Sequence, residues 1–227
     1  MTILGIDSSS KSASAAIIKD GKILCENYLN TGFTHSQTLM KLTQDCFSET
    51  GLSVGDLDYI AVSNGPGSFT GVRIGLAFVK GLAFTNNLKC CPVSTLESLA
   101  VNVKCFTGKV YCILDARCSQ VYFAQFESDG KEIKRLCEDC ALSLEEVKAK
   151  ALSEEKNIIL VGDGAEICFE HLKSDCKNVI ISSENIRYTT ASGVCAASCA
   201  EKAIDSDKLL PNYLRLPQAQ RNLKKES

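Results

Sequence analysis

The chain has 227 residues, of which 45% are hydrophobic, so it is long enough to bury a sizeable core in one or two domains. Its 25 lysines and arginines nearly balance its 27 aspartates and glutamates, which excludes a strongly basic surface of the kind that holds nucleic acid directly. The sequence has no run of roughly 18 apolar residues and no leader before its first strand, so we expect a cytoplasmic protein without membrane contact.

The first half of the chain predicts strands and helices in alternation. An apolar strand ends on Asp7, and the hairpin that follows it turns at Asp20-Gly21, a dipeptide that suits a tight hairpin. Amphipathic or alanine-rich spacing marks the helices. The predicted strands cover residues 3–7, 13–18, 23–28 and 59–62, and the predicted helices cover residues 36–48, 72–84 and 95–101.

A glycine-rich run joins the strand that ends at Val62 to the helix that begins at Val72. It reads Asn64-Gly65-Pro66-Gly67-Ser68-Phe69-Thr70-Gly71, and its backbone amides at the start of a helix are placed to cradle an anion. The spacing fits neither a P-loop nor the dinucleotide fingerprint. Two interpretations stay open: an anion site, or a tight turn whose glycines only relieve crowding.

The second half repeats the first. Another apolar strand ends on Asp115, 108 residues after Asp7, and another hairpin turns at Asp129-Gly130, 109 residues after Asp20-Gly21. Two offsets that agree so closely indicate duplication. We therefore predict an N-terminal lobe over residues 1–102 and a C-terminal lobe over residues 103–227, with the last helix and the tail able to pack on either lobe. The further helices are expected over residues 144–151, 165–172 and 191–204.

Cysteine and histidine usage argues against a metal centre. Thirteen cysteines are scattered among apolar positions, as free thiols would be in a reducing compartment. The Cys137-x-x-Cys140 pair has no second pair at zinc-ribbon spacing. His35 and His171 are the two histidines of the chain, too few for an H-E-x-x-H motif with a further histidine ligand. We interpret His35 as a cap or interface residue and His171 as a solvated or capping residue, and we predict no metal site.

The duplicated layout resembles the superfamily of actin, sugar kinases and the Hsp70 ATPase, which implies an α/β fold of two ribonuclease H-like lobes with nucleotide between them. The resemblance implies that Asp7 orients a magnesium-bound water and that the serines after it and the glycine-rich turn approach phosphates. Asp115 and residues 162–164 then face them from the second lobe. The expected weak, vestigial nucleotide site, for ATP or ADP, consists of Asp7, Ser8, Ser9, Gly65, Gly67 and Arg117.

Six segments together resemble the bacterial TsaB (YeaZ) family over essentially the whole chain. The family resemblance implies a non-catalytic partner of TsaD, the enzyme that places threonylcarbamoyl on N6 of the adenosine beside the anticodon of certain tRNAs. It also implies a third component, the ATPase TsaE. Relatives have carried glycoprotease or peptidase M22-like labels. The segments are residues 3–9, 34–36, 65–75, 92–97, 115–117 and 211–215.

The same resemblance argues against peptidase chemistry. The catalytic relative binds its metal through two histidines four residues apart, in a segment that follows its own glycine-rich helix. The matching segment here, residues 92–99, has Thr95 and Leu99 at those two positions. A leucine side chain has no lone pair for a cation. We therefore expect no catalytic residues, no required cofactor and no enzyme activity in the isolated chain.

The working surface of a partner protein is expected on the two N-lobe helices. Interior glycines such as Gly75 and Gly81 cost about 1 kcal/mol each relative to alanine, a cost that close packing with another helix offsets. We expect a heterodimer with the catalytic relative through this surface, a homodimer when the chain is alone, and only indirect contact with tRNA. The predicted interface residues are His35, Leu39, Met40, Thr43, Arg73, Gly75, Phe78 and Leu82.

Two other functions compete with this hypothesis. A stand-alone ATPase or small-molecule kinase would make use of Asp7, the serines after it and the glycine-rich turn, and tight ATP binding with turnover would favour it. A metallopeptidase is the least favoured alternative, because it needs a transition metal that this sequence cannot coordinate in the usual way.

Overall fold

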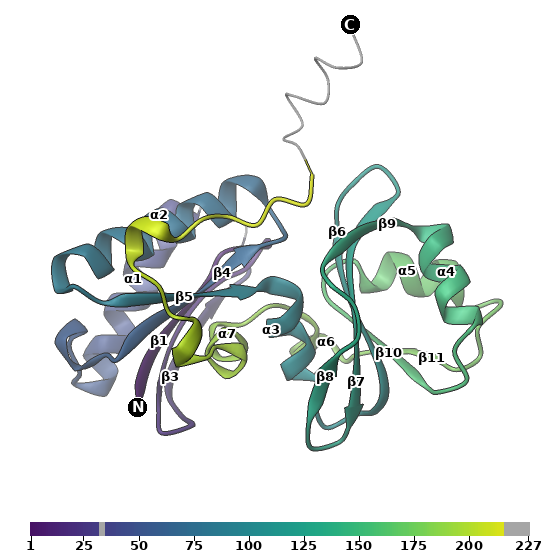
Figure 1. The fold of residues 1–227 in the computed structure, drawn as a ribbon, viewed down its shortest axis with the longest axis horizontal. Coiled ribbons are helices and arrows are strands. Elements are labelled where there is room, and N and C mark those ends of the chain that lie inside the picture. The colour runs from purple at the N-terminus through teal and green to yellow at the C-terminus, as the bar shows by residue number, and fades with distance from the viewer. Residues whose placement is uncertain (32–34, 216–227) are drawn as a thin grey trace, which may run out of the picture.

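The computed structural model describes residues 1–31 and 35–215, and it places two β-sheets side by side (Figure 1). In the first sheet the strand order is β3-β2-β1-β4-β5. Antiparallel pairing joins β1 to β2 and β2 to β3, whereas β4 and β5 continue parallel to β1. The strands are β1 (Thr2–Asp7), β2 (Ala13–Lys19), β3 (Lys22–Leu29), β4 (Tyr59–Gly65) and β5 (Lys89–Ser94).

Two long helices cover one face of the first sheet, α1 (His35–Thr50) and α2 (Phe69–Asn86), with the short 3-10 helix η1 (Val54–Asp56) between them in sequence. Ser68 caps α2 by accepting a hydrogen bond from the Gly71 amide, and the left-handed Asn87 ends the helix. Their apolar faces bury the first core cluster, which includes Leu4, Ile60, Leu39, Leu42 and Val79.

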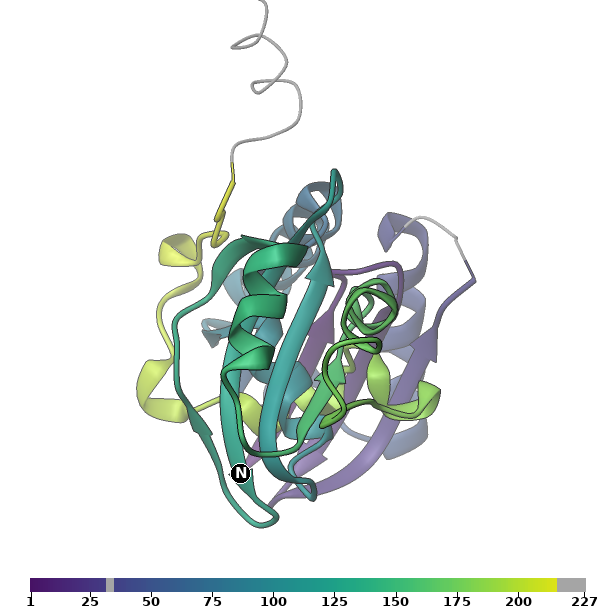
Figure 2. The same ribbon diagram turned by 90° about the vertical axis from the view of Figure 1, so that its right-hand side faces the viewer.

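The second sheet repeats the plan of the first, with the order β11-β10-β6-β7-β8 and β9 paired to β7. The central strand is β6, which pairs antiparallel with β7 and parallel with β10. Helices α4 and α5 cover its outer face (Figure 2). The elements are β6 (Thr107–Asp115), β7 (Gln120–Asp129), β8 (Ile133–Arg135), β9 (Cys140–Ser143), α4 (Leu144–Leu152), β10 (Ile158–Val161), α5 (Ala165–Leu172) and β11 (Val179–Ile181).

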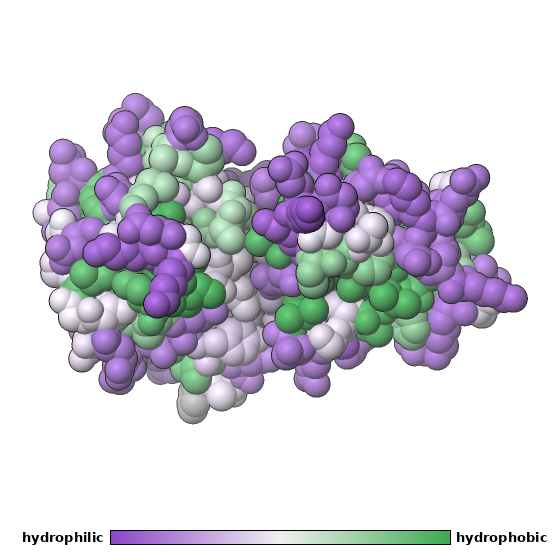
Figure 3. Space-filling model, turned by 90° about the horizontal axis from the view of Figure 1, so that it is seen from below, coloured by the Kyte–Doolittle hydropathy of each residue, from purple (hydrophilic) through white to green (hydrophobic). Residues whose placement is uncertain are grey.

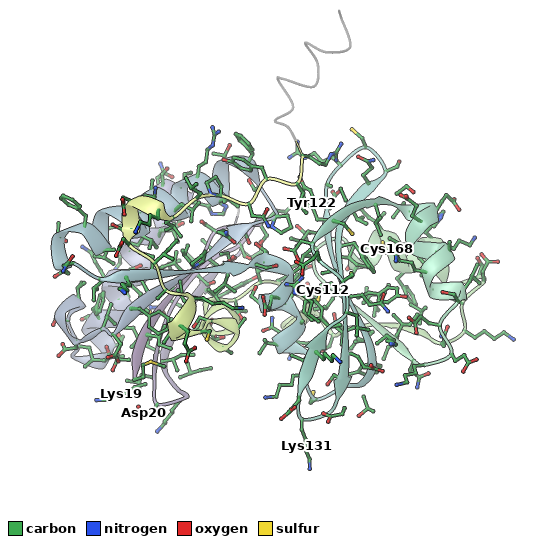
Figure 4. All side chains as sticks on the ribbon, in the orientation of Figure 1. Lys19, Asp20, Cys112, Tyr122, Lys131 and Cys168 are labelled. Atoms are coloured by element: carbon green, nitrogen blue, oxygen red, sulfur yellow. The ribbon has the colours of Figure 1, made fainter. Side chains whose placement is uncertain are left out.

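The two predicted hairpins occupy equivalent places. Lys19 and Asp20 mark the tip of one and Lys131 the tip of the other, and both tips point downward in Figure 4. Asp20 and Gly21 both have positive φ, 51° and 77°, as a tight two-residue turn requires. The duplication predicted from sequence is thus present in the strand order and in the turns.

Two helices each pack on the sheet of the other lobe. Helix α3 (Thr95–Asn102) follows the first sheet in sequence but packs its apolar side, with Leu96 and Leu99, against the inner face of the second sheet. Helix α7 (Ala191–Ala197) follows the second sheet but packs Val194 and Cys195 on the inner face of the first. Both helices lie in the middle of the molecule (Figure 1). In sequence, the short helix α6 (Glu184–Arg187) precedes α7. The boundary after residue 102 therefore separates the two sheets but not the packing units.

The chain after α7 returns along the first lobe. The helix expected over residues 191–204 ends at Ala197, because Ile204 instead forms a two-way backbone bridge with Cys90 of β5. Two short 3-10 helices follow, η2 (Ala200–Lys202) and η3 (Ser206–Lys208). Residues 205–215, the C-terminal strap, then run beside α2 toward the second lobe, in yellow in Figure 1. The end of the tail, from residue 216 onward, lies outside the described residues.

Buried side chains form a core on both faces of the second sheet. Cys112 belongs to the cluster beneath α3 and Cys168 to the cluster beneath α4 and α5, on opposite faces of the second sheet (Figure 4). Seen from below, hydrophilic residues dominate the outline, and apolar residues show between them on both lobes (Figure 3). None of the helices in the described ranges is long and apolar enough to cross a membrane.

Candidate functional site

Asp7 ends β1 at the edge of the sheet where the parallel strands also end, and its side chain is fully buried. The carboxylate is held by hydrogen bonds within the chain. Oδ1 accepts from the Ser9 hydroxyl at 2.7 Å and from the Ser9 amide at 3.4 Å, and Oδ2 accepts from the Thr189 hydroxyl at 2.7 Å. A buried carboxylate needs such donors, since leaving it unpaired is costly.

Thr189 connects the two ends of the chain at this point. It lies between α6 and α7, is almost fully buried, and its hydroxyl is also 3.0 Å from the Ser10 hydroxyl, which is in turn 3.0 Å from that of Ser12. Sequence analysis did not find this residue. Its one local signal is its position just before an alanine-rich helix, and nothing in that signal points to a partner in the first strand.

The glycines of the predicted anion loop make close backbone contacts. A Cβ on Gly67 would lie 2.3 Å from the Ser9 carbonyl oxygen, and one on Gly71 would lie 2.1 Å from that of Ser8. The Ser68 amide donates to the Ser9 carbonyl at 2.7 Å, and the Ser8 hydroxyl donates to the Gly71 carbonyl at 2.9 Å. Thus the glycine-rich turn packs on the loop that follows β1, and one amide that was predicted to cradle an anion serves this packing.

The C-terminal strap covers the outer side of the same turn. Gly65, with φ of +114°, faces the Asn212 carbonyl oxygen, 2.6 Å from where a Cβ would be. The Asn212 amide donates to the Asn64 carbonyl at 2.7 Å. Further along, Tyr213 stacks on Phe69 with ring centroids 4.4 Å apart. The strap therefore closes over the start of α2.

Arg73, a predicted interface residue, takes part in this arrangement. Its Nε donates to the Tyr213 hydroxyl at 2.6 Å, and its guanidinium lies 3.9 Å from the Phe69 ring centroid. At the end of the strap, Arg215 donates to the Ala116 carbonyl of the second lobe at 2.8 Å. Arg73 is thus exposed but already bound to the strap, and the strap reaches both lobes.

On the second lobe, Asp115 and Asp163 meet at the equivalent edge. The Asp115 amide donates to the Asp163 carboxylate at 3.0 Å, and the Arg117 amide donates to the Asp115 carboxylate at 2.7 Å. Burial raises the pKa of Asp163 above its usual value. Arg117 has φ of 62° and an exposed side chain, and within the described ranges it forms no ion pair.

The two positions that the family resemblance matches to metal ligands lie inside the protein. Thr95 and Leu99 are both fully buried, and Leu99 belongs to the core beneath α3. The Ser94 hydroxyl, which caps this helix, donates to Asp139 at 2.6 Å, and Arg135 pairs with Asp139 at 2.7 Å. In the part of the chain that the structure describes, no group of three or more His, Cys, Asp or Glu side chains is placed to hold a metal ion.

The two histidines have structural partners. His35 begins α1, and its Nε2 lies 2.9 Å from the Ser10 carbonyl oxygen, so it ties the helix to the loop after β1. His171 lies in the last turn of α5, where its Nε2 is 3.0 Å from the Glu145 carboxylate on α4.

The predicted interface residues fall into two groups. Met40 is 55% exposed, and His35, Phe78 and Leu82 are half-buried. Leu39, Thr43 and Gly75 do not reach the surface. Leu39 and Thr43 face the core from α1, and Gly75 packs on the Ser8 hydroxyl, so their packing is within the lobe.

The sequence pointed to Gly81 but not to its neighbours on the outward face of α2. Ala77, Gly81 and Phe84 are exposed there, and Phe84 is 82% exposed. No described atom lies within 4 Å of the place where a Cβ on Gly81 would be. The spacing of 4 and 3 residues puts all three on one side of the helix, and this set with Met40 is called the α1/α2 surface below.

The two mixed sheets with matching strand order define a fold class, the duplicated ribonuclease H-like lobes that also form the fold of actin, sugar kinases and the Hsp70 ATPase. A solved ROK hexokinase from Thermus thermophilus shares the fold, with a TM-score of 0.50, 11% identity and coverage of 89% of this chain and 98% of the other. YeaZ from Pseudomonas aeruginosa matches much better, with a TM-score of 0.80, 24% identity and coverage of 94% and 99%.

The amino-acid sequence matches one family of proteins. The family model described as "TsaD: tRNA N6-adenosine threonylcarbamoyltransferase" matches residues 30–224. The tRNA threonylcarbamoyladenosine biosynthesis protein TsaB of Bacillus subtilis is 26% identical over 226 residues, covering 97% of this chain and 96% of the relative. TsaB of Escherichia coli is 35% identical over 140 residues, 59% and 58% of the two chains. The chain belongs to the TsaB (YeaZ) family, within the wider group that the TsaD model describes.

Proposed function

We propose that this chain is a non-catalytic partner and scaffold of a TsaD-type enzyme in the synthesis of N6-threonylcarbamoyladenosine in tRNA. The observation that carries the proposal is the burial of Thr95 and Leu99 in the core. These positions offer neither an imidazole nor an open space for a substrate-bound metal. The names of the relatives and the match to the TsaD model support the pathway.

A required nucleotide is not part of this proposal. Asp7 already accepts three hydrogen bonds from Ser9 and Thr189, and the Ser68 amide is bound to the Ser9 carbonyl. Magnesium or phosphate would have to replace these bonds, which disfavours the stand-alone ATPase or kinase. Weak ATP or ADP binding remains part of the proposal, with Arg117 as its exposed cation, and calorimetry with Mg-ATP on the isolated chain measures it.

The α1/α2 surface is the proposed docking site for the TsaD-type relative. Phe84 exposes a large apolar ring, and Gly81 lets another backbone approach, although a glycine inside a helix costs stability. Because the TsaD model covers residues 30–224, the partner has the counterpart of this helix pair, and like helices pack in pseudo-symmetric pairs. The same surface allows self-association when the partner is absent.

The remaining partners follow from the role of a scaffold. A TsaE-type ATPase joins the complex, and tRNA contacts the complex mainly through other subunits, since the formal net charge of this chain is −2. The complex acts in the cytoplasm.

The test uses substitutions that disturb the surface without disturbing the lobe. Gly81→Leu adds a side chain where no described atom is near, and Phe84→Asp charges a ring that is 82% exposed. We expect each to weaken binding of the TsaD-type relative by about tenfold or more and to reduce tRNA modification by the reconstituted complex in parallel.

Ile167→Asp is the matched control, because Ile167 is 47% exposed on α5 of the other lobe. It is expected to leave both measurements unchanged. Folded Gly81→Leu and Phe84→Asp variants that bind and support modification normally would refute the docking site. Transfer or hydrolysis by the isolated chain would refute the scaffold role itself.

A further inference from the structure

Two thiols lie beside one asparagine side chain between β3 and α1. Cys25 lies in the middle of β3 and is half-buried, whereas Cys46 lies on α1 and is fully buried. Cys46 belongs to the core cluster under α1, and Cys25 packs against that cluster. The Asn27 side-chain amide reaches both sulfurs, with Nδ2 3.8 Å from Cys25 Sγ and 3.4 Å from Cys46 Sγ.

The surroundings hold this pair in place. Asn27 is itself anchored through a 3.2 Å hydrogen bond to the Leu42 carbonyl of α1, and the Cys46 thiol donates to the Ala15 carbonyl of β2 at 3.2 Å. Two cysteines can be bridged without moving the backbone only if their side chains already face each other. Here the helix and the strand place both sulfurs around the same Asn27 amide nitrogen, and both are free thiols.

We infer that Cys25 and Cys46 form a modification site, at which a low-molecular-weight disulfide of the oxidised-glutathione class converts the two thiols into a reversible disulfide between β3 and α1.

The two thiols have different roles in this exchange. Cys25 is the one that solvent reaches, so its thiolate attacks the glutathione disulfide, forms a mixed disulfide and releases one glutathione thiolate. The sulfur of Cys46 then loses its proton to solvent and attacks Cys25 Sγ, which expels the second glutathione as a thiolate. The two protein thiols are oxidised, one glutathione disulfide is reduced to two glutathione molecules, and the protons lost by the protein are taken up by the leaving thiolates.

The second step is the slow one. Burial, together with the Cys25 thiol, raises the pKa of Cys46 to about 12, and the thiolate is the attacking form. Ring closure should therefore speed up as pH rises toward that value. Once formed, the bond ties α1 to the sheet and closes the loop between Cys25 and Cys46, which constrains the unfolded chain and should raise the melting temperature by about 5–10 °C.

The experiment starts from full-length protein in which the exposed Cys105 and Cys118 are replaced by serine, so that fewer competing thiols react. The protein is incubated with oxidised glutathione, alkylated and digested without reduction, and the peptides are analysed by mass spectrometry. We expect a crosslink between the peptides of Cys25 and Cys46, reversal by dithiothreitol, and the rise in melting temperature.

Two single variants make the result decisive. Cys46→Ser should stop at the mixed disulfide, with one glutathionyl group on Cys25, and Cys25→Ser should leave Cys46 unmodified in the folded protein. Near-ultraviolet circular dichroism checks that each variant is folded. The inference is overturned if folded parent protein carries glutathione on Cys25 without a crosslink, or if Cys46 reacts equally well when Cys25 is absent.

Discussion

The hydroxyl of Thr189 donates a 2.7 Å hydrogen bond to the Asp7 carboxylate, across 182 positions of sequence. It brings a residue from the connection before α7 into the end of the first strand. The first lobe therefore depends on the second half of the chain, because Thr189 supplies a hydrogen bond to the Asp7 carboxylate.

Thr189→Val tests this bond, because valine keeps the shape and removes the donor. Removing one donor from a buried carboxylate should lower the free energy of unfolding by about 1–3 kcal/mol. Urea denaturation measures the change. Thr189→Ser keeps the hydroxyl and should lose clearly less, so equal losses in the two variants would mean that the methyl group, and not the bond, matters.

Two glycines of α2 should respond in opposite directions to the same change. A Cβ on Gly71 would lie 2.1 Å from the Ser8 carbonyl oxygen, so Gly71→Ala should destabilise the protein by about 2–3 kcal/mol. No described atom lies within 4 Å of a Cβ on Gly81, and Gly81→Ala should stabilise the isolated chain by roughly 0.5–1 kcal/mol. Thermal and urea unfolding of both variants measure the difference, and the same sign in both would contradict these contacts.

The strap should loosen when its aromatic anchor is removed. Tyr213→Ala removes the stack on Phe69 and the acceptor of the Arg73 hydrogen bond, at a cost of about 0.5–1.5 kcal/mol. Hydrogen exchange should quicken at the Asn212 amide, which donates to the Asn64 carbonyl. Tyr213→Phe keeps the stack and is expected to protect that amide better than alanine does. No difference between the two would assign the anchoring to other contacts.

Asp139 joins the second lobe to the start of α3. It accepts from the Ser94 hydroxyl and pairs with Arg135, which also contacts Glu97 at 3.3 Å. Because the Asp139 side chain is only 7% exposed, Asp139→Ala should destabilise the protein by about 2 kcal/mol in urea unfolding. The exposed pair Glu170–Lys173 provides the comparison, and Glu170→Ala should change stability by less than about 0.5 kcal/mol.

The half-buried Asp163 should make stability depend on pH. Its pKa is raised by burial, so the folded state holds the proton more tightly than the unfolded state, and stability relative to an uncharged side chain falls as pH rises through this range. Asp163→Asn should therefore be more stable than the parent at pH 7. The gain should vanish near pH 3, because the Asp163 carboxyl is then largely protonated in the folded and in the unfolded protein.

Asp175 supplies the opposite sign for the same measurement. The hydrogen bond from Lys148 lowers the pKa of Asp175, so Asp175→Asn should be less stable than the parent at pH 7, with a loss that shrinks in acid. Urea midpoints at the two pH values measure both variants. Equal behaviour of the two variants would contradict the environments described for these carboxyls.

The sequence revealed the parts of the fold that local patterns encode. Asp7 and Asp115 do end equivalent strands, the Asp20-Gly21 and Asp129-Gly130 turns do close hairpins, and helix α5 has the predicted bounds. These features arise from side-chain periodicity and turn chemistry within a few residues. The fold class was also identified correctly from the duplicated layout, and the family from matched segments.

The features of the site that the sequence does not reveal depend on distant contacts. Thr189 has no local feature that identifies Asp7 as its partner. Glycine is needed at positions 67 and 71 because the backbone of Ser9 and Ser8 leaves no room for a Cβ, and this contact is not visible in the local sequence. For Leu39 and Thr43, helical spacing allowed either an inward or an outward side, and the sheet beneath α1 decided for the inward one.

The crossing of α3 and α7 between the lobes has a consequence for folding. A fragment that stops after residue 102 would carry α3 without the sheet it covers and would lack α7, so two apolar faces would stand open to water. The inner face of each sheet is thus covered by a helix from the other half of the chain. Unfolding should therefore proceed as one cooperative event, with no stable half-molecule for proteases or chaperones to encounter.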